Sequence, residues 1–112
     1  MDFLSYFFDI GGQTMKERDY QRKLISTVTE MFPCCLILKN DPTYVQGIPD
    51  LSVFYHDRYA MLEVKIDGEA SIQPNQQYYI DWINNTGGFG RFIFPENEEV
   101  VLNELKEYFE NA

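Results

Sequence analysis

The chain has 112 residues, a net charge of −9, and 45% hydrophobic and 24% charged residues, a length that allows one compact domain and excludes two of ordinary size. Its apolar runs fall short of the ~18 residues that a membrane-spanning helix needs, so we expect no membrane segment. The excess of acid argues against a protein that grips nucleic acid through a broad basic surface, because neutralising phosphates requires Lys and Arg.

The first fifteen residues form an apolar extension, and we place the domain proper at residues 16–112. Six of the residues between positions 3 and 10 are apolar or aromatic, namely Phe3, Leu4, Tyr6, Phe7, Phe8 and Ile10. A set this apolar is expected to pack on the domain or on a second copy of the chain.

A helix is predicted next, because large apolar residues recur every four positions at Tyr20, Leu24, Val28 and Phe32. Pro33 should end it. Residues 34–39 then read as a buried strand in which Cys34 and Cys35 are buried thiols, since they have no CxxC spacing. Residues 40–47 form a polar loop around Asp41-Pro42.

Residues 51–55 and 59–66 predict two strands joined by a short hairpin at residues 56–58. If Tyr55 pairs with Ala60, Asp50 lies opposite Lys65. Asp50, Glu63 and Lys65 then share one face of the sheet, so the hairpin alone would bring them together.

The last third of the chain predicts a loop at residues 67–73, a helix at residues 76–85 for which Pro74 suits a first helical position, a strand at residues 91–94, and a helix from Pro95 to about Phe109. The resulting order is α-β-β-β-α-β-α. It predicts an α/β sandwich in which helices flank a mixed sheet, with a hairpin in the middle and a crossover helix before the last strand.

The residues that carry chemistry are Gly47-Ile48-Pro49-Asp50 and, twelve residues later, Glu63-Val64-Lys65. Two carboxylates are ligands that a hard divalent cation prefers, and a lysine beside them can act on a bound water. This combination is typical of metal-dependent phosphodiester hydrolysis. The alternatives are an ion pair between Glu63 and Lys65 on an exposed strand, and Asp50 as a turn residue.

The ordered set of motifs resembles the PD-(D/E)XK nuclease superfamily, and within it the small stand-alone VRR-NUC proteins of phages and prophages, which are similar to Holliday-junction resolvases. The resemblance covers about residues 16–110. It rests on Glu17-x-x-Tyr20-Gln21-x-x-Leu24-Ile25, Lys39-Asn40-Asp41, Gln46-Gly47-Ile48-Pro49-Asp50-Leu51, Leu62-Glu63-Val64-Lys65, Gln73-Pro74-Asn75-Gln76-x-x-Tyr79 and Phe94-Pro95-Glu96-Asn97. It implies a restriction-endonuclease-like fold.

The resemblance also implies the roles of the site residues. Asp50, Glu63 and the Val64 carbonyl would bind Mg²⁺ or Mn²⁺, and Lys65 would orient or deprotonate the attacking water. Glu17 would contact the metal directly or through water, unless it is an ordinary acid of a first helical turn. Gln76 would point back at the site, unless it is a solvated helix residue and Gln73 or Gln77 takes its place.

Four basic residues are candidate phosphate contacts or, equally, solvated surface residues: Lys39, Arg22, Lys23 and Arg91. Trp82 and Tyr79 read as helix-packing residues rather than as platforms for bases. His56, at a hairpin tip, is given no catalytic role.

The function that the resemblance implies is a metal-dependent endonuclease that cuts DNA, especially branched or four-way-junction DNA, as a homodimer in the cytoplasm of a bacterial host. One rival is a catalytically silent nuclease fold that serves as a binding or regulatory module. Another is an acidic interaction protein such as a DNA mimic. A DNA mimic needs carboxylates over its whole surface. Here the acidic excess is concentrated in the last helix, since six Glu and one Lys give residues 96–112 a net charge of −5.

Overall fold

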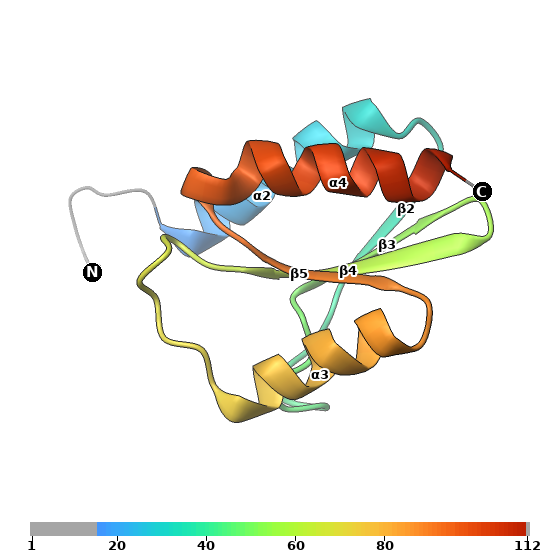
Figure 1. The fold of residues 1–112 in the computed structure, drawn as a ribbon. Helices are drawn as coiled ribbons and strands as arrows, with labels where there is room; N and C mark the ends of the chain where they lie inside the picture. The colour runs from blue at the N-terminus through green and yellow to red at the C-terminus, as the bar shows by residue number, and fades with distance from the viewer. Residues whose placement is uncertain (1–15, 112) are drawn as a thin grey trace.

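The computed structural model describes residues 16–111 and shows a mixed α/β fold (Figure 1). Its elements in chain order are α2 (Glu17–Met31), β2 (Leu36–Lys39), β3 (Leu51–Tyr55), β4 (Arg58–Val64), α3 (Pro74–Asn85), β5 (Phe89–Ile93), a 3₁₀ turn (Pro95–Asn97) and α4 (Glu98–Glu110). This order confirms the predicted α-β-β-β-α-β-α sequence. The apolar extension lies outside the described residues.

The four strands form one mixed sheet in the order β2-β3-β4-β5. The β2–β3 and β3–β4 pairs are antiparallel, and β4 and β5 are parallel with α3 as the crossover between them. Helices α2 and α4 cover one face of the sheet and α3 covers the other (Figure 1). The predicted central hairpin and crossover helix are therefore confirmed.

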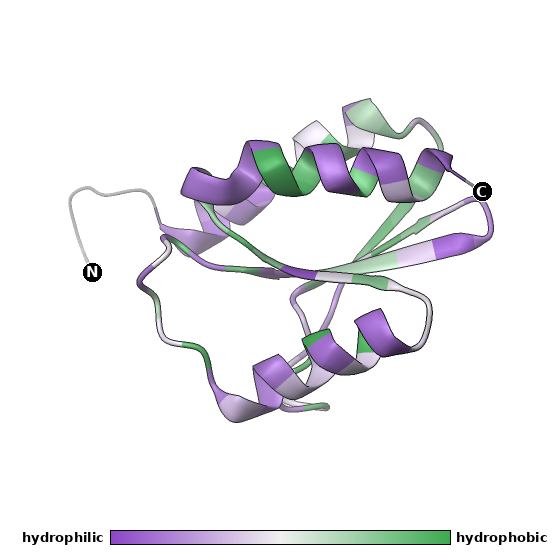
Figure 2. Cartoon of the chain, viewed as in Figure 1, coloured by the Kyte–Doolittle hydropathy of each residue, from purple (hydrophilic) through white to green (hydrophobic). Residues whose placement is uncertain are grey.

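The main core lies between the sheet and the pair α2 and α4. The apolar stripe of α2 is buried there, and alternate residues of the central strands face it: Leu51, Val53, Ala60, Leu62 and Val64. Figure 2 shows green, hydrophobic segments interspersed with purple, hydrophilic ones along both the strands and the helices. The opposite face of β4 is thus left for polar residues and for α3.

The register of the β3–β4 hairpin differs from the prediction by two residues. Tyr55 pairs with Arg58 rather than with Ala60, because the connection is a two-residue turn in which His56 has a φ of 57°. A shift of two positions keeps every side chain on its predicted face. Continuing the register by one position beyond Leu51 and Leu62 places Asp50 opposite Glu63 instead of Lys65.

The prediction of a buried strand at residues 34–39 is wrong in two respects. The strand begins at Leu36, since Cys34 has a φ of 73° and belongs to the turn after α2, with its side chain exposed. The strand also lies at the edge of the sheet, so Leu36 and Leu38 are 55% and 45% exposed. A run of apolar residues does not distinguish a central strand from an edge strand.

Pro74 takes the first helical position that the sequence predicts for it, whereas the last strand starts earlier than predicted. Helix α3 begins at Pro74, and Gln73 caps it by exchanging hydrogen bonds with Gln76. Strand β5 begins at Phe89, which pairs with Ala60 of β4, and the next residue, Gly90, allows α3 to pack closely: a Cβ there would lie 3.1 Å from the Ile80 carbonyl oxygen. Across residues 16–111, no helix has the length and apolar character to cross a bilayer.

Candidate functional site

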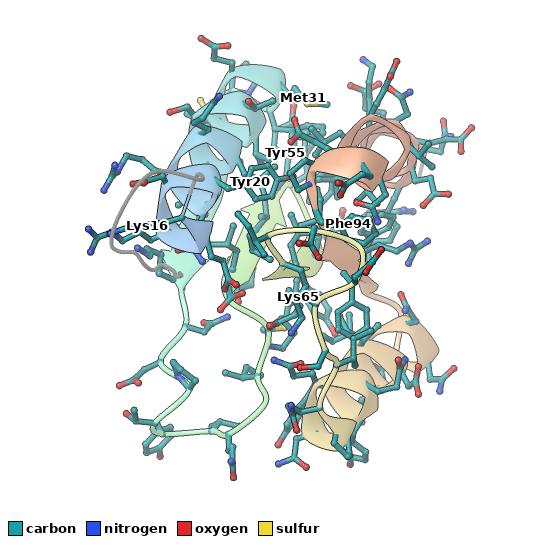
Figure 3. The ribbon with its side chains drawn as sticks, turned by 90° about the vertical axis from the view of Figure 1, so that its left-hand side faces the viewer. Lys16, Tyr20, Met31, Tyr55, Lys65 and Phe94 are labelled. Atoms are coloured by element: carbon teal, nitrogen blue, oxygen red, sulfur yellow. The ribbon has the colours of Figure 1, made fainter. Side chains whose placement is uncertain are left out.

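The candidate site lies at one end of the sheet, on the face that α3 covers. Asp50 immediately precedes β3, Glu63 is the second-last residue of β4, and Lys65 follows β4. Alternation along β4 directs Glu63 and Lys65 away from the core that contains Leu62 and Val64. Figure 3 looks onto this end of the molecule and shows Lys65 between α2 above and α3 below.

Asp50 is held in place by the backbone of the neighbouring strand. Its Oδ2 accepts a hydrogen bond from the Val64 N–H at 2.8 Å. Burial raises the pKa of Asp50 above its usual value, against the opposing effects of the Val64 N–H, Lys65 and Lys39. The carboxylate therefore lies in a partly desolvated setting with two lysines near it.

Glu63, Lys65 and Gln76 form one buried hydrogen-bonded network. Glu63 and Lys65 are only 4% and 9% exposed. The Lys65 Nζ donates to Gln76 Oε1 at 2.9 Å and to the Ser71 carbonyl oxygen at 3.0 Å, and it lies 3.6 Å from Glu63 Oε2. The Gln76 Nε2 donates to Glu63 Oε2 at 2.9 Å. Gln76, rather than Gln73 or Gln77, is thus the glutamine that meets the predicted carboxylate and lysine.

Glu63 has one oxygen with no partner. Its Oε1 is buried and makes no hydrogen bond within the described part of the chain. Burial is the main cause that raises the pKa of Glu63 to about 7, and the charges of Asp50 and Glu17 add to it while Lys65 opposes it. An unpaired buried carboxylate oxygen is costly unless a cation or a donor meets it. Its chemistry fits a divalent metal ion.

Glu17 lies at the rim of this cluster rather than inside it. Its side chain is largely exposed, at the start of α2. Partial burial of the carboxyl is the first cause that raises its pKa, followed by the Asp50 charge, while Lys65 lowers it. Glu17 is therefore close enough for the charges of Asp50 and Lys65 to act on it. Its exposure allows a contact with a metal ion through water.

The four predicted phosphate contacts do not all gather here. Lys39 ends β2 and its charge acts on Asp50. Arg22 pairs with Asp19 on α2, and Lys23 lines a groove between α2 and α4. Arg91 is turned to the other face, where its Nε lies 3.2 Å from Glu104 Oε1 of α4. Only Lys39 is placed beside the carboxylates.

Sequence reasoning assigned no role to two groups that support the site, although Asn40 is part of the motif Lys39-Asn40-Asp41. The Asn40 side chain donates to the Pro49 carbonyl oxygen and to Ser52 Oγ, both at 2.9 Å. The backbone N–H of Asn40 donates to the Asp50 carbonyl oxygen at 2.8 Å. Asn40 could have been found from its position opposite Asp50 in an extended β2–β3 ladder. The contact of the Ser71 carbonyl oxygen with Lys65 could not be predicted from the sequence, because any residue supplies a backbone oxygen.

Gly47 explains how the loop before Asp50 meets α3. It has a φ of +90°, and a Cβ on it would lie 2.3 Å from the Asn75 Cβ. Only glycine combines this backbone conformation with so close an approach. This close approach is made to the first turn of α3, the turn that also carries Gln76.

The described residues contain no group of three or more His, Cys, Asp or Glu side chains arranged to hold a metal ion. A cation here would depend on two carboxylates, completed by backbone oxygen and water, a ligand set that Mg²⁺ accepts because it usually retains several waters. Comparison with models of known protein families gives no match, and comparison with curated proteins gives none either.

Proposed function

We propose that this protein is a Mg²⁺- or Mn²⁺-dependent endonuclease that hydrolyses DNA phosphodiester bonds. The observation that supports it most is the cluster of Asp50 and Gln76 around the buried Glu63 and Lys65, in which one oxygen of Glu63 meets no hydrogen-bond partner among residues 16–111. A solvated ion pair on an exposed strand would show neither the burial of Glu63 and Lys65 nor the raised pKa of Glu63.

Asp50 and Glu63 would hold the metal, with the Val64 carbonyl as a further ligand and Glu17 reaching it directly or through water. The metal would supply a water of lowered pKa and positive charge for the phosphate. Binding it would offset the charge of Asp50, which raises the pKa of both Glu17 and Glu63, and the charge of Glu17, which raises that of Glu63. That relief is a reason for acids to be gathered in a site of this kind.

Lys65 would act on the attacking water or on the phosphate. Its Nζ is fixed from two sides by Gln76 and the Ser71 carbonyl, so its direction is set before substrate binds. Gln76 has a second task, since its Nε2 holds the Glu63 carboxylate. One glutamine therefore sets the spacing between the metal-binding acid and the lysine, which makes it a positioning residue.

The partners proposed are branched DNA and a second copy of the chain, in the cytoplasm of a bacterial host that carries a phage or prophage. The acidic surface makes a structured substrate more plausible than plain duplex, because few cations are available to bind phosphates non-specifically. Two sites in a homodimer would suit paired cuts on a four-way junction.

The test is cleavage of a labelled four-way junction, a flap, a duplex and a single strand, each with Mg²⁺, with Mn²⁺ and with chelator. We expect metal-dependent cutting that falls at least about 100-fold in Glu63→Gln and in Asp50→Asn, because each removes a metal-binding charge. Glu104→Gln, an exposed acid on α4, is the matched control and should cut normally.

The outcomes separate the rival functions. Full activity in both site variants would overturn the assignment of Asp50 and Glu63. Absence of cutting on every substrate, with Mn²⁺ bound by the unaltered protein and not by Glu63→Gln, would favour the silent nuclease-fold module. Absence of both cutting and metal binding would favour an acidic interaction protein.

A further inference from the structure

An aromatic pocket lies beside the candidate site. It has a volume of about 190 Å³ and is lined by Ile48, Met61, Tyr78, Tyr79, Trp82 and Ile83. Trp82 and Tyr78 are 50% and 61% exposed, so the helix packing predicted for Trp82 leaves half of its surface open. The helix α3 is anchored instead by Ile80 and Ile83, which are buried.

Each structural element of this pocket also carries a residue of the candidate site. Met61 and Glu63 lie two residues apart on one face of β4, which separates them by about 7 Å. Tyr79 follows Gln76 by three positions, so both lie on one side of α3. Ile48 is two residues before Asp50. The pocket is therefore the direct continuation of the site along the same sheet face.

The size and lining of the pocket define what it can take. A volume of about 190 Å³ is below the range of about 300–1,000 Å³ typical of sites for drug-sized molecules, so one planar ring system fits and a larger ligand does not. Its walls are rings and aliphatic groups, and Tyr78 and Tyr79 meet edge to face with ring centroids 5.1 Å apart. Stacking and apolar contact are the interactions it offers.

We propose that this pocket binds one unstacked nucleobase of the strand being cut, next to the scissile phosphate. The inference rests on the proposed nuclease function and narrows its substrate to DNA with an unpaired or easily unpaired base at the cut. Stacking on an aromatic side chain is tolerant of sequence and needs no positive charge, which suits a protein with a net charge of −9. A junction, flap or single strand offers such a base and a continuous duplex does not.

Trp82 is the only tryptophan of the chain, so its fluorescence reports on this pocket directly. The experiment uses the full-length Glu63→Gln protein in chelator, where binding is measured without cleavage. The probes are a DNA duplex and the same duplex carrying one unpaired base. We expect saturable quenching of Trp82 by the second probe, with affinity at least about tenfold higher than for the first.

Variants locate the binding surface. Tyr78→Ala in the same Glu63→Gln background should weaken the binding of the unpaired-base probe on the order of tenfold and bring it near that of plain duplex. Val100→Ala, which alters an equally exposed side chain on α4, should change nothing. Because the Tyr78 side chain is mostly exposed, the Tyr78→Ala variant should have the same thermal unfolding midpoint as the Glu63→Gln parent.

The proposal is overturned if the two probes quench Trp82 equally, or if Tyr78→Ala and Val100→Ala bind alike. If the unaltered protein cleaves DNA in either case, the nuclease function is supported and the binding of a base in this pocket is overturned. Selective quenching without cleavage by the unaltered protein would support the base pocket and overturn the nuclease function, so the two failures are distinguishable.

Discussion

At the scale of single residues, Glu63 is a carboxylate whose ionisation conflicts with its surroundings. It is 4% exposed, faces the charges of Asp50 and Glu17, and has an oxygen that meets no hydrogen-bond partner within residues 16–111. Lys65 and Gln76 offset part of this cost at Oε2. In the absence of metal, the native state is therefore expected to retain a proton on Glu63 that the unfolded chain has released.

This has a definite consequence for the pH dependence of stability. The pKa of Glu63 is raised from 4.5 to about 7, so between these values the native state binds more protons than the unfolded state. The free energy of unfolding of the metal-free protein should fall as pH rises through this window. Glu63→Gln should flatten the fall, without removing it, because the pKa values of Asp50 and Glu17 are raised too.

Chemical denaturation at a series of pH values between 4.5 and 7, in chelator, measures this effect. Glu104→Gln serves as the control, because that exposed carboxylate pairs with Arg91 on the surface. If the free energy of unfolding falls with pH equally in the parent and in Glu63→Gln, then Glu63 is not the source of this pH dependence.

At the scale of elements, the site depends on how the loop before β3 rests against α3. Gly47 has a φ of +90° and its position for a Cβ lies 2.3 Å from Asn75, whereas Gly87 has a φ of +97° with nothing within 4 Å. The two glycines share the backbone requirement and differ in crowding. Replacing each with alanine therefore separates the conformational cost of a positive φ, which both variants share, from the displacement of α3, which only Gly47→Ala requires.

We expect Gly87→Ala to lower the free energy of unfolding by about 1 kcal/mol and Gly47→Ala to lower it by more, about 2–3 kcal/mol, since the loop and α3 must also move apart. Movement of the first turn of α3 carries Gln76 with it, so Gly47→Ala should also reduce cleavage while Gly87→Ala does not. Urea denaturation and the junction-cleavage assay measure both. Similar losses in the two variants would show that the contact with Asn75 has no part in positioning the site.

The elements also show how much the sequence could predict. Alternation along residues 51–65 predicts that Asp50, Glu63 and Lys65 share a face, and this survives a register error of two because side chains repeat every two positions. Turn length was not readable from His56-Asp57-Arg58, so the exact partners were wrong. The exposure of β2 and the contact of Lys65 with the Ser71 carbonyl depend on tertiary placement, which local patterns do not contain.

At the scale of the whole molecule, the described elements cover only part of the sheet face that carries the site. Helix α3 packs on β4 and β5, while Leu36, Leu38 and Phe54 on the β2 side are 55%, 45% and 41% exposed. An edge strand with apolar side chains is a surface on which a second copy can pair. A two-fold, self-complementary contact between β2 strands would extend the sheet and leave both sites on the same face.

This arrangement predicts that Leu38→Lys disrupts the proposed homodimer. The added charges would face each other across the two-fold axis, so the dissociation constant should rise at least about tenfold, and sedimentation velocity over a concentration series measures it. Val100→Lys places the same charge on α4, where Val100 is 60% exposed, and should leave association unchanged. A parent protein that sediments as a monomer at high micromolar concentration would contradict the homodimer. Equal weakening by both variants would instead show that general charge repulsion, and not the β2 edge, controls association.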